Sequence, residues 1–188
     1  MDERRTIRSI SFDTSFLLKE DASVDQIIKT IVHDRIPCFV TATVASELEQ
    51  LKIWGRITET KHKKAIKRLT HAHATVIDFK NRLVSGTLGQ ACLRSMERHG
   101  IEPNHVRNDC NILVSTLKNG VDLFLSEDFH FTSVITKDVI KEVKHAACSE
   151  YYLMCDSQLY SIDTATFLKT YANGTIDLNH ISAYQHQE

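Results

Sequence analysis

The sequence predicts an α/β fold, a three-layer α/β/α sandwich around a central, mostly parallel five-stranded sheet. Two observations lead to this prediction. Short apolar runs alternate along the chain with segments whose apolar side chains recur at the spacing of a helix face. In addition, a helix separates each predicted strand from the next, and strands joined through a helix usually pair in parallel. The 188 residues are enough for one such domain.

Five apolar runs are the predicted strands. They cover residues 7–12, 37–41, 75–79, 121–125 and 159–162. The predicted helices cover residues 24–34, 42–51, 60–73, 90–98, 109–118, 133–152 and 166–172. The apolar face of the first helix is Val24, Ile27, Ile28 and Ile31, and that of the second is Val44, Leu48 and Leu51. The third helix places Ile66 and Leu69 inward, with Lys61, Lys64 and Arg68 on a neighbouring face.

Turn-forming residues set several of these boundaries. Gly86 and Gly89 mark a loop before helix 90–98. Asn108 is a favourable N-cap for helix 109–118. Gly174 ends the last helix. The predicted domain therefore spans residues 1–174, and residues 175–188 are expected to form a polar C-terminal tail.

The charge balance excludes a general attraction to anionic partners. There are 23 basic and 24 acidic side chains, so the net charge is -1. The distribution is uneven, because residues 52–82 contain nine Lys or Arg and only two acids. This segment is the expected contact for an anion, although a solvated helix face would explain such a charge run equally well.

The composition indicates a soluble, cytoplasmic protein with no membrane contact. The charged N-terminus does not have the pattern of a signal peptide, and no apolar stretch is long enough to span a bilayer. Five cysteines without a CxxC pair argue against a secreted disulfide framework, and Cys38, Cys92 and Cys110 are predicted core residues. The ten histidines lack the spacing of a structural zinc site.

Four carboxylates occupy positions that favour a shared site. Asp13 and Asp128 follow the first and fourth strands, and ligands of parallel sheets bind beyond the carboxyl ends of the strands. Glu47 lies about 40° from Leu51 around its helix, at the margin of the apolar stripe. Asp109 projects between apolar residues of its own helix. Acids at such margins need partners, and a divalent cation would supply one.

Oxygen ligands of this kind suit Mg²⁺ or Mn²⁺, and such a site also leaves positions for water and a phosphate oxygen. Three of the acids also have a purely structural explanation. Asp13 could cap the next turn, Glu47 could be a surface acid, and Asp109 could interact with its helix dipole. The occurrence of all four together favours the metal site.

Four motifs in series resemble the PIN domain family. Residues 10–18 read ISFDTSFLL, an apolar strand ending in Asp, and residues 40–48 read VTATVASEL, a strand and helix with Glu-Leu. Residues 108–120 begin with Asn-Asp and end in Asn-Gly around an apolar helix. Residues 125–131 read LSEDFHF, a strand followed by Ser, one residue and Asp. A final strand and the TATFL sequence of residues 164–168 also resemble the end of the family's domain.

The resemblance implies a PIN-like nuclease domain, with a metal-dependent ribonuclease activity that cleaves single-stranded RNA as an endonuclease. By the resemblance, Asp13, Glu47, Asp109 and Asp128 bind Mg²⁺ or Mn²⁺, and Ser126 is a further catalytic-site residue. Since the predicted helix 60–73 is basic, we expect it to contact the RNA backbone. The residues expected to do so are Lys61, Lys64 and Arg68.

The sequence departs from the family pattern at several positions. Ser15 stands where Asn is commonest, and His130 stands where a second Asp often occurs. Glu127 adds an acid beside Asp128, and the segment 80–107 is longer than in compact toxin-type members. Trp54 follows the Glu47 helix, and we expect it to pack beside the helix end rather than stack on a base.

Two other functions are also compatible with the sequence. A PIN-like module could bind RNA or a protein without cleaving, although such a module has no need of four acids. A phosphotransfer domain also uses an Asp after its first strand, but residues 13–15 supply no second acid beside it. Partners implied by the resemblance are RNA, a second copy of the chain, and an antitoxin or an RNA-processing complex.

Overall fold

The computed structural model describes residues 4–181 and confirms the predicted α/β architecture. The central sheet has the strand order β4-β3-β2-β5-β6, and every pairing within it is parallel. The strands are β2 (Ile10–Phe12), β3 (Cys38–Thr41), β4 (Thr75–Ile77), β5 (Leu123–Leu125) and β6 (Tyr160–Ile162). Each lies within one of the five predicted runs.

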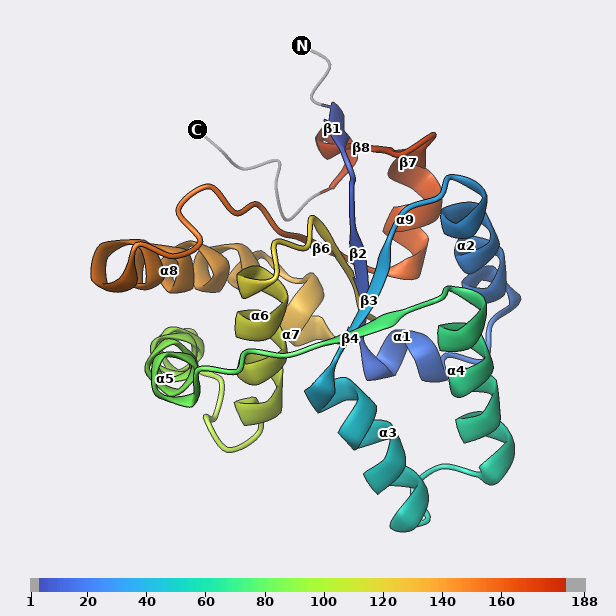
Figure 1. The fold of residues 1–188 in the computed structure, drawn as a ribbon, viewed down its shortest axis with the longest axis horizontal. Coiled ribbons are helices and arrows are strands. Elements are labelled where there is room, and N and C mark those ends of the chain that lie inside the picture. Colours follow the sequence, from blue (N-terminus) through green and yellow to red (C-terminus); the bar gives the residue numbers. More distant parts are fainter. Residues whose placement is uncertain (1–3, 182–188) are drawn as a thin grey trace.

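Helices cover both faces of this sheet, which Figure 1 shows nearly edge-on. On one side lie α5 (Arg82–Arg98), α6 (Arg107–Lys118) and α8 (Val134–Tyr151). On the other lie α2 (Ala22–His33), α4 (Glu59–His71) and α9 (Thr164–Thr170). The short helices α1 (Thr14–Leu18) and α7 (Phe129–Thr132) follow β2 and β5, and α3 (Ala42–Ile53) follows β3 directly. The arrangement is the expected three-layer sandwich.

Two predicted helix starts are wrong. α5 begins at Arg82 and runs through both Gly86 and Gly89, because the side chain of Asn81 accepts a hydrogen bond from Val84 N and caps the helix. A Cβ atom on Gly89 would lie 3.7 Å from the side chain of Asn111, so this glycine lies at the contact with α6. The predicted N-cap Asn108 lies inside the first turn of α6, whose N-cap position is Val106.

The face that α4 buries also differs from the prediction. His62, Ala65 and Arg68 are buried, whereas Ile66 is 39% exposed. The buried face is therefore displaced around the helix from the one that the apolar residues predict. The displacement lets the Arg68 side chain reach backbone carbonyls of the segment that joins α1 to α2.

A second, three-stranded sheet joins the two ends of the described chain. Its order is β1-β8-β7, all antiparallel, and the strands are β1 (Arg4–Thr6), β7 (Tyr171–Ala172) and β8 (Thr175–Asp177). Ile176 is fully buried, and a 3-10 helix follows at Leu178–His180. Residues 175–181 thus belong to the fold, which corrects the predicted tail over that range. The rest of that tail, 182–188, lies outside the described residues.

Four of the five cysteines are joined in disulfides, although the cysteine pattern argued against a disulfide framework. Cys92 of α5 faces Cys110 of α6, with the two Cα atoms 5.6 Å apart, and Cys148 pairs with Cys155. Cys38, Cys92 and Cys110 are all buried, as predicted. In the described range, no helix is long and apolar enough to cross a membrane.

Candidate active site

Three parallel strands bring the predicted acids to one edge of the sheet. β2 and β5 are paired in register with Phe12 opposite Leu125, so both strands end at the same level. The residue after β2 is Asp13, and its backbone N–H donates to the carbonyl of Leu125 over 2.9 Å. Residues 126–128 follow β5, and β3 leads straight into α3, which carries Glu47. Ligands of parallel sheets bind at this edge.

Asp13 is buried, with only 5% of its surface exposed, and two serine hydroxyls hold it. Its Oδ2 accepts hydrogen bonds from Ser15 Oγ at 2.5 Å and from Ser126 Oγ at 2.8 Å. Asp13 also caps α1, so its structural and functional explanations both apply. Burial raises the pKa of this carboxyl, and the nearby charge of Glu47 raises it further, although the two hydroxyls oppose the shift.

Ser126 and Ser15 connect Asp13 to the segment after β5. Ser126 Oγ accepts the backbone N–H of Asp128 at 3.0 Å, and Ser15 Oγ accepts that of Glu127 at 2.9 Å. Serine at position 15, which departs from the family pattern, therefore still positions Asp13. These contacts set the position of Asp128 relative to Asp13.

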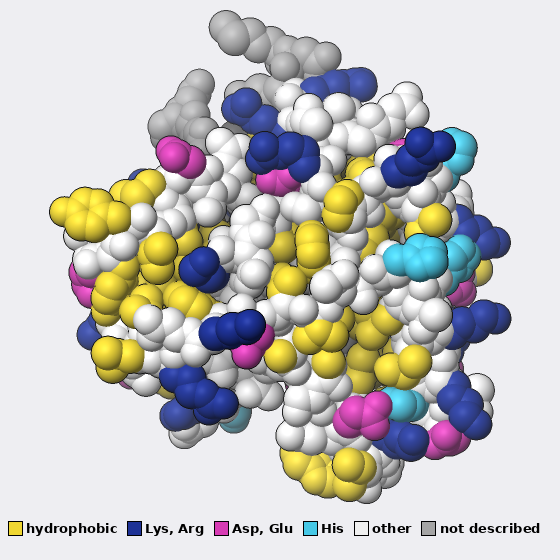
Figure 2. Space-filling view, viewed as in Figure 1, with side chains coloured by type: hydrophobic (Ala, Val, Ile, Leu, Met, Phe, Trp, Pro, Cys, Tyr) yellow, Lys and Arg dark blue, Asp and Glu magenta, His cyan; other side chains and the backbone are white. Residues whose placement is uncertain are grey.

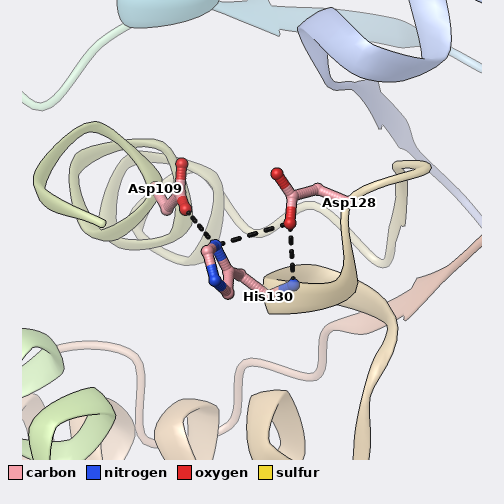
Figure 3. Close-up of side chains that lie close together, drawn as sticks. All are labelled: Asp109, Asp128 and His130. Carbon is pink, nitrogen blue, oxygen red and sulfur yellow. Dashed lines mark hydrogen bonds and ion pairs between the residues drawn. The ribbon is translucent and has the colours of Figure 1, made fainter. Parts of the chain in front are cut away.

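Asp109, Asp128 and His130 form the tightest cluster at this edge (Figure 3). His130 Nδ1 lies 3.0 Å from Asp109 Oδ2 and 3.4 Å from Asp128 Oδ1. Asp128 also caps α7 by accepting the backbone N–H of His130 over 2.8 Å, and this turn folds the ring back toward the carboxylates. One ligand atom from each of the three side chains lies within 4.8 Å of the others, so together they could hold a cation.

The environment of Asp109 raises its pKa to about 6. Burial is the largest cause, while the hydrogen bond to His130 opposes the shift and the charges of Asp128 and Asp13 add to it. These effects show that the fields of three carboxylates overlap at this site. A carboxyl group that is half-protonated at about pH 6 without a cation is expected where like charges meet in a partly buried position.

Glu47 lies at the other side of Asp13. Its Oε2 accepts a hydrogen bond from Thr14 Oγ1 at 2.5 Å, and its side chain is partly buried. Since the charge of Glu47 acts on Asp13, and that of Asp13 acts on Asp109, the four predicted acids form one electrostatic group. All four, together with Ser126, are thus at the same edge of the sheet.

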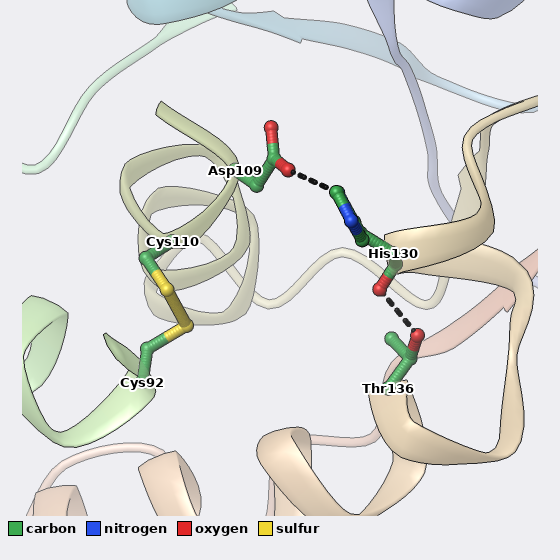
Figure 4. Close-up of a disulfide and its surroundings, with 5 residues drawn as sticks. All are labelled: Cys92, Asp109, Cys110, His130 and Thr136. Carbon is green, nitrogen blue, oxygen red and sulfur yellow. Dashed lines mark hydrogen bonds and ion pairs between the residues drawn. A yellow bond between two sulfur atoms is a disulfide. The ribbon is translucent and has the colours of Figure 1, made fainter. Parts of the chain in front are cut away.

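The structure adds one residue that the sequence analysis did not propose, His130. Sequence reasoning treated it as the loss of an acid, whereas its ring lies between two of the predicted ligands. A signal was available, because a residue two positions after an N-cap Asp has its backbone N–H directed at that carboxylate. The backbone carbonyl of His130 accepts the hydroxyl of Thr136, and this further fixes the turn (Figure 4).

Arg68 is not available to RNA, which corrects its predicted role. Only 3% of its surface is exposed, and its guanidinium donates to Asp25 and to the carbonyls of Leu17 and Lys19. The fold uses its donors because the turn between α1 and α2 presents carbonyls that need partners. Lys61 and Lys64 are partly exposed, and they lie 2.9 Å from Glu20 and 3.7 Å from Asp25.

A groove with a basic lining lies between α2 and α4. Its volume is about 570 Å³, and Lys29, Lys63, Lys64 and Lys67 are among the side chains that line it. In Figure 2, many Lys and Arg side chains lie along the edge of the molecule formed by α4. Most lysines of the basic segment predicted from the sequence are therefore accessible, whereas Arg68 of the same segment is buried.

Glu127 turns away from the acids. Its carboxylate pairs with Lys19 at 2.7 Å and accepts hydrogen bonds from the backbone and hydroxyl of Thr164. It therefore holds the start of α9 to the segment after β5. On the opposite side of Asp109, the Cys92–Cys110 disulfide ties α6 to α5 (Figure 4).

No family model and no curated protein matches this chain. The assignment of a function therefore depends on the residues and geometry described above.

Proposed function

We propose that this protein is a PIN-like, metal-dependent endoribonuclease that hydrolyses single-stranded RNA at the Asp13, Glu47, Asp109 and Asp128 cluster. The observation that carries the proposal is the overlap of carboxylate fields at the carboxyl ends of β2 and β5. Burial raises the pKa of Asp109 to about 6, and the charges of Asp128 and Asp13 add to the shift. A structure gains no stability from such an arrangement of like charges, so a cationic ligand is the natural explanation. A cytoplasmic location is part of the same proposal.

The chemistry of the donor set fits a divalent cation. Carboxylate oxygens suit Mg²⁺ and Mn²⁺, and the imidazole of His130 favours Mn²⁺, because nitrogen is a poorer ligand for Mg²⁺. Asp109, Asp128 and His130 lie close enough together to hold the ion, and Asp13 and Glu47 would complete the site from the side of β2. When bound, such an ion lowers the pKa of water and neutralises charge on a phosphodiester.

The chain's own groups then have distinct tasks. Ser15 and Ser126 hold one oxygen of Asp13 in place, which fixes the direction in which the other oxygen points. His130 bridges Asp109 and Asp128, and its ring holds the two carboxylates in fixed positions relative to each other. The exposed amines of Lys61 and Lys64 would attract the phosphate backbone, an effect that weakens with salt.

A cleavage assay tests the proposal directly. End-labelled, mixed-sequence single-stranded RNA is incubated with the protein in Mn²⁺, in Mg²⁺ and in EDTA. An Asp13→Asn, Asp109→Asn double variant prepared in parallel detects contaminating ribonuclease. We expect cleavage that needs the metal and is lost in the double variant. Equal activity in both proteins would indicate a contaminant, and the absence of both cleavage and metal binding would favour a non-catalytic binding module.

A further inference from the structure

Two exposed aromatic side chains lie on the elements that carry the acids. Trp54 is 66% exposed at the end of α3, and Phe129 is 64% exposed as the first residue of α7. Most other phenylalanines of the fold, such as Phe12, Phe124 and Phe131, are fully buried. The expectation that Trp54 packs beside the helix end is therefore wrong. Because these two rings lie on the elements that carry the acids, their exposure favours a binding role at this site.

Trp54 lies on the same face of α3 as Glu47. The two residues are seven positions apart, and seven steps of about 100° return to within about 20° of the same direction. Seven residues also advance about 10 Å along the helix axis. The ring of Trp54 is thus two turns from the acid, at the outer end of the helix.

That distance matches a short piece of single-stranded nucleic acid. At the about 3.4 Å rise of a stacked strand, about 10 Å corresponds to about three nucleotides. A base on Trp54 would therefore belong to the same strand as a phosphodiester at the acids. Figure 2 shows hydrophobic side chains at the end of the lobe that α3 and α4 form, so this surface is open to a ligand.

Phe129 lies at the acids themselves. It directly follows Asp128, which caps α7, and its ring centroid lies 6.4 Å from that of His130. Since the His130 ring contacts both Asp109 and Asp128, the Phe129 ring lies next to the same cluster. The two aromatic rings therefore stand at two distances from the acids, one beside them and one two helical turns away.

Positive charge accompanies the outer ring. Arg56 is exposed two residues after Trp54, and Lys52, two residues before Trp54, lies 3.4 Å from Glu59. An exposed aromatic with cations beside it is the combination that binds a base and its phosphates, and every base has a face that can stack. A protein partner would instead favour a larger apolar patch with a polar rim.

We propose that Trp54 and Phe129 stack on bases of single-stranded RNA and so position the phosphodiester at the acidic cluster. The inference rests on the proposed function for its substrate, but it concerns binding and not cleavage. Stacking on aromatic rings tolerates any base, so the contacts set the placement of the strand rather than its sequence.

The chain offers its own reporter, because Trp54 is the single tryptophan. The fluorescence of the full-length protein in EDTA, where RNA stays intact, is titrated with oligoadenylate RNA and with an abasic strand of the same length. We expect saturable quenching by oligoadenylate and none by the abasic strand. Saturable binding of oligoadenylate, detected by the anisotropy of a label on the RNA, without a change in Trp54 emission would overturn the proposal.

Variants extend the test. Trp54→Ala and Phe129→Ala should each weaken RNA binding about tenfold, and Trp54→Phe should retain most of the affinity. The control is Tyr152→Asn, since Tyr152 is 88% exposed at the far end of α8 and should have no effect. Equal affinities for the wild type, Trp54→Ala and Phe129→Ala would overturn stacking even if the protein cleaves RNA. Quenching with no cleavage would support stacking and count against the nuclease.

Discussion

Ser126 Oγ donates a hydrogen bond to Asp13 Oδ2 over 2.8 Å and accepts the backbone N–H of Asp128 at 3.0 Å. One buried hydroxyl thus connects the acids that follow two neighbouring strands. Ser126 follows β5 and contacts Asp13, which follows β2. This contact gives a structural reason for the Ser and the Asp two residues apart after β5.

The first prediction concerns this hydroxyl. Ser126→Ala should lower the affinity for Mn²⁺ by roughly tenfold, because Asp13 and Asp128 would lose the contact that sets their relative position. Unfolding should also become easier by about 1 to 3 kcal/mol. Calorimetric titration and thermal melts measure the two effects. Ser149→Ala is the control, since its hydroxyl only returns to its own helix in α8. Unchanged metal affinity in Ser126→Ala would contradict the assigned role.

The second prediction concerns Asp109 in EDTA. Its pKa is about 6 in the folded protein and 3.8 as the reference value, so the folded state holds the proton more tightly than the unfolded state. Ionisation of Asp109 therefore lowers the free energy of unfolding. The full effect is present above the folded pKa, and it disappears below the reference pKa. Asp109→Asn should stabilise the metal-free protein by about 1 to 3 kcal/mol above pH 6.

The sign of the pH dependence checks this account. The advantage of Asp109→Asn should shrink as the pH falls from about 6 toward 3.8, since the wild-type carboxyl then becomes neutral. Urea unfolding of both proteins across that range measures the difference. Asp156→Asn, at an exposed position, should show no such trend. A variant that is less stable than the wild type in EDTA at neutral pH would refute the repulsion argument.

The third prediction separates Arg68 from the lysines of the same helix. Arg68→Ala should lower the free energy of unfolding by about 3 kcal/mol, because Asp25 and the carbonyls of Leu17 and Lys19 would lose their donor. Lys61→Ala should change it by less than about 0.5 kcal/mol, as expected of a surface pair. Thermal melts compare the two. Similar effects of both variants would mean that the Arg68 contacts contribute little.

The fourth prediction concerns the C-terminal strand. Ile176→Ala should destabilise the protein by about 2 to 4 kcal/mol, since Ile176 of β8 is fully buried between β1 and β7. Ile66→Ala on the surface of α4 is the matched control and should cost far less. Denaturant titrations measure both. Equal effects would show that residues 175–177 are a dispensable tail, as the composition alone suggested.

Periodicity predicted the sheet because its strands are apolar and, apart from the edge strand β4, largely buried. Each predicted strand run contains a strand of the central sheet, and Asp13 and Asp128 follow from the direction of parallel strands. The start of α5 was predicted wrongly because Gly86 and Gly89 are typical of a loop. The sequence does not show that Gly89 packs against α6. β7 and β8 escaped detection because residues up to 172 were assigned to the last helix and Gly174 to its end, and because the second partner of β8, β1, lies at the other end of the chain.

The four acids of the site were predicted from the sequence, but the contact of His130 and the burial of Arg68 were not. A carboxylate position follows from strand ends and helix angles, which are local properties. The contact of His130 with Asp109 joins residues 21 apart, and the burial of Arg68 depends on carbonyls 49 and 51 residues away. Such contacts depend on tertiary packing, so the sequence indicates at most the local contact of His130 with Asp128 and not its contact with Asp109.

The most direct test of the central claim, one cation site built from the four acids, is a calorimetric titration with Mn²⁺. We predict saturable binding to the wild type near neutral pH that weakens as the pH falls below about 6, where Asp109 takes up a proton. Binding should be lost in the Asp13→Asn, Asp109→Asn double variant and retained in Asp156→Asn. Undiminished binding in the double variant, or none in the wild type, would contradict the claim.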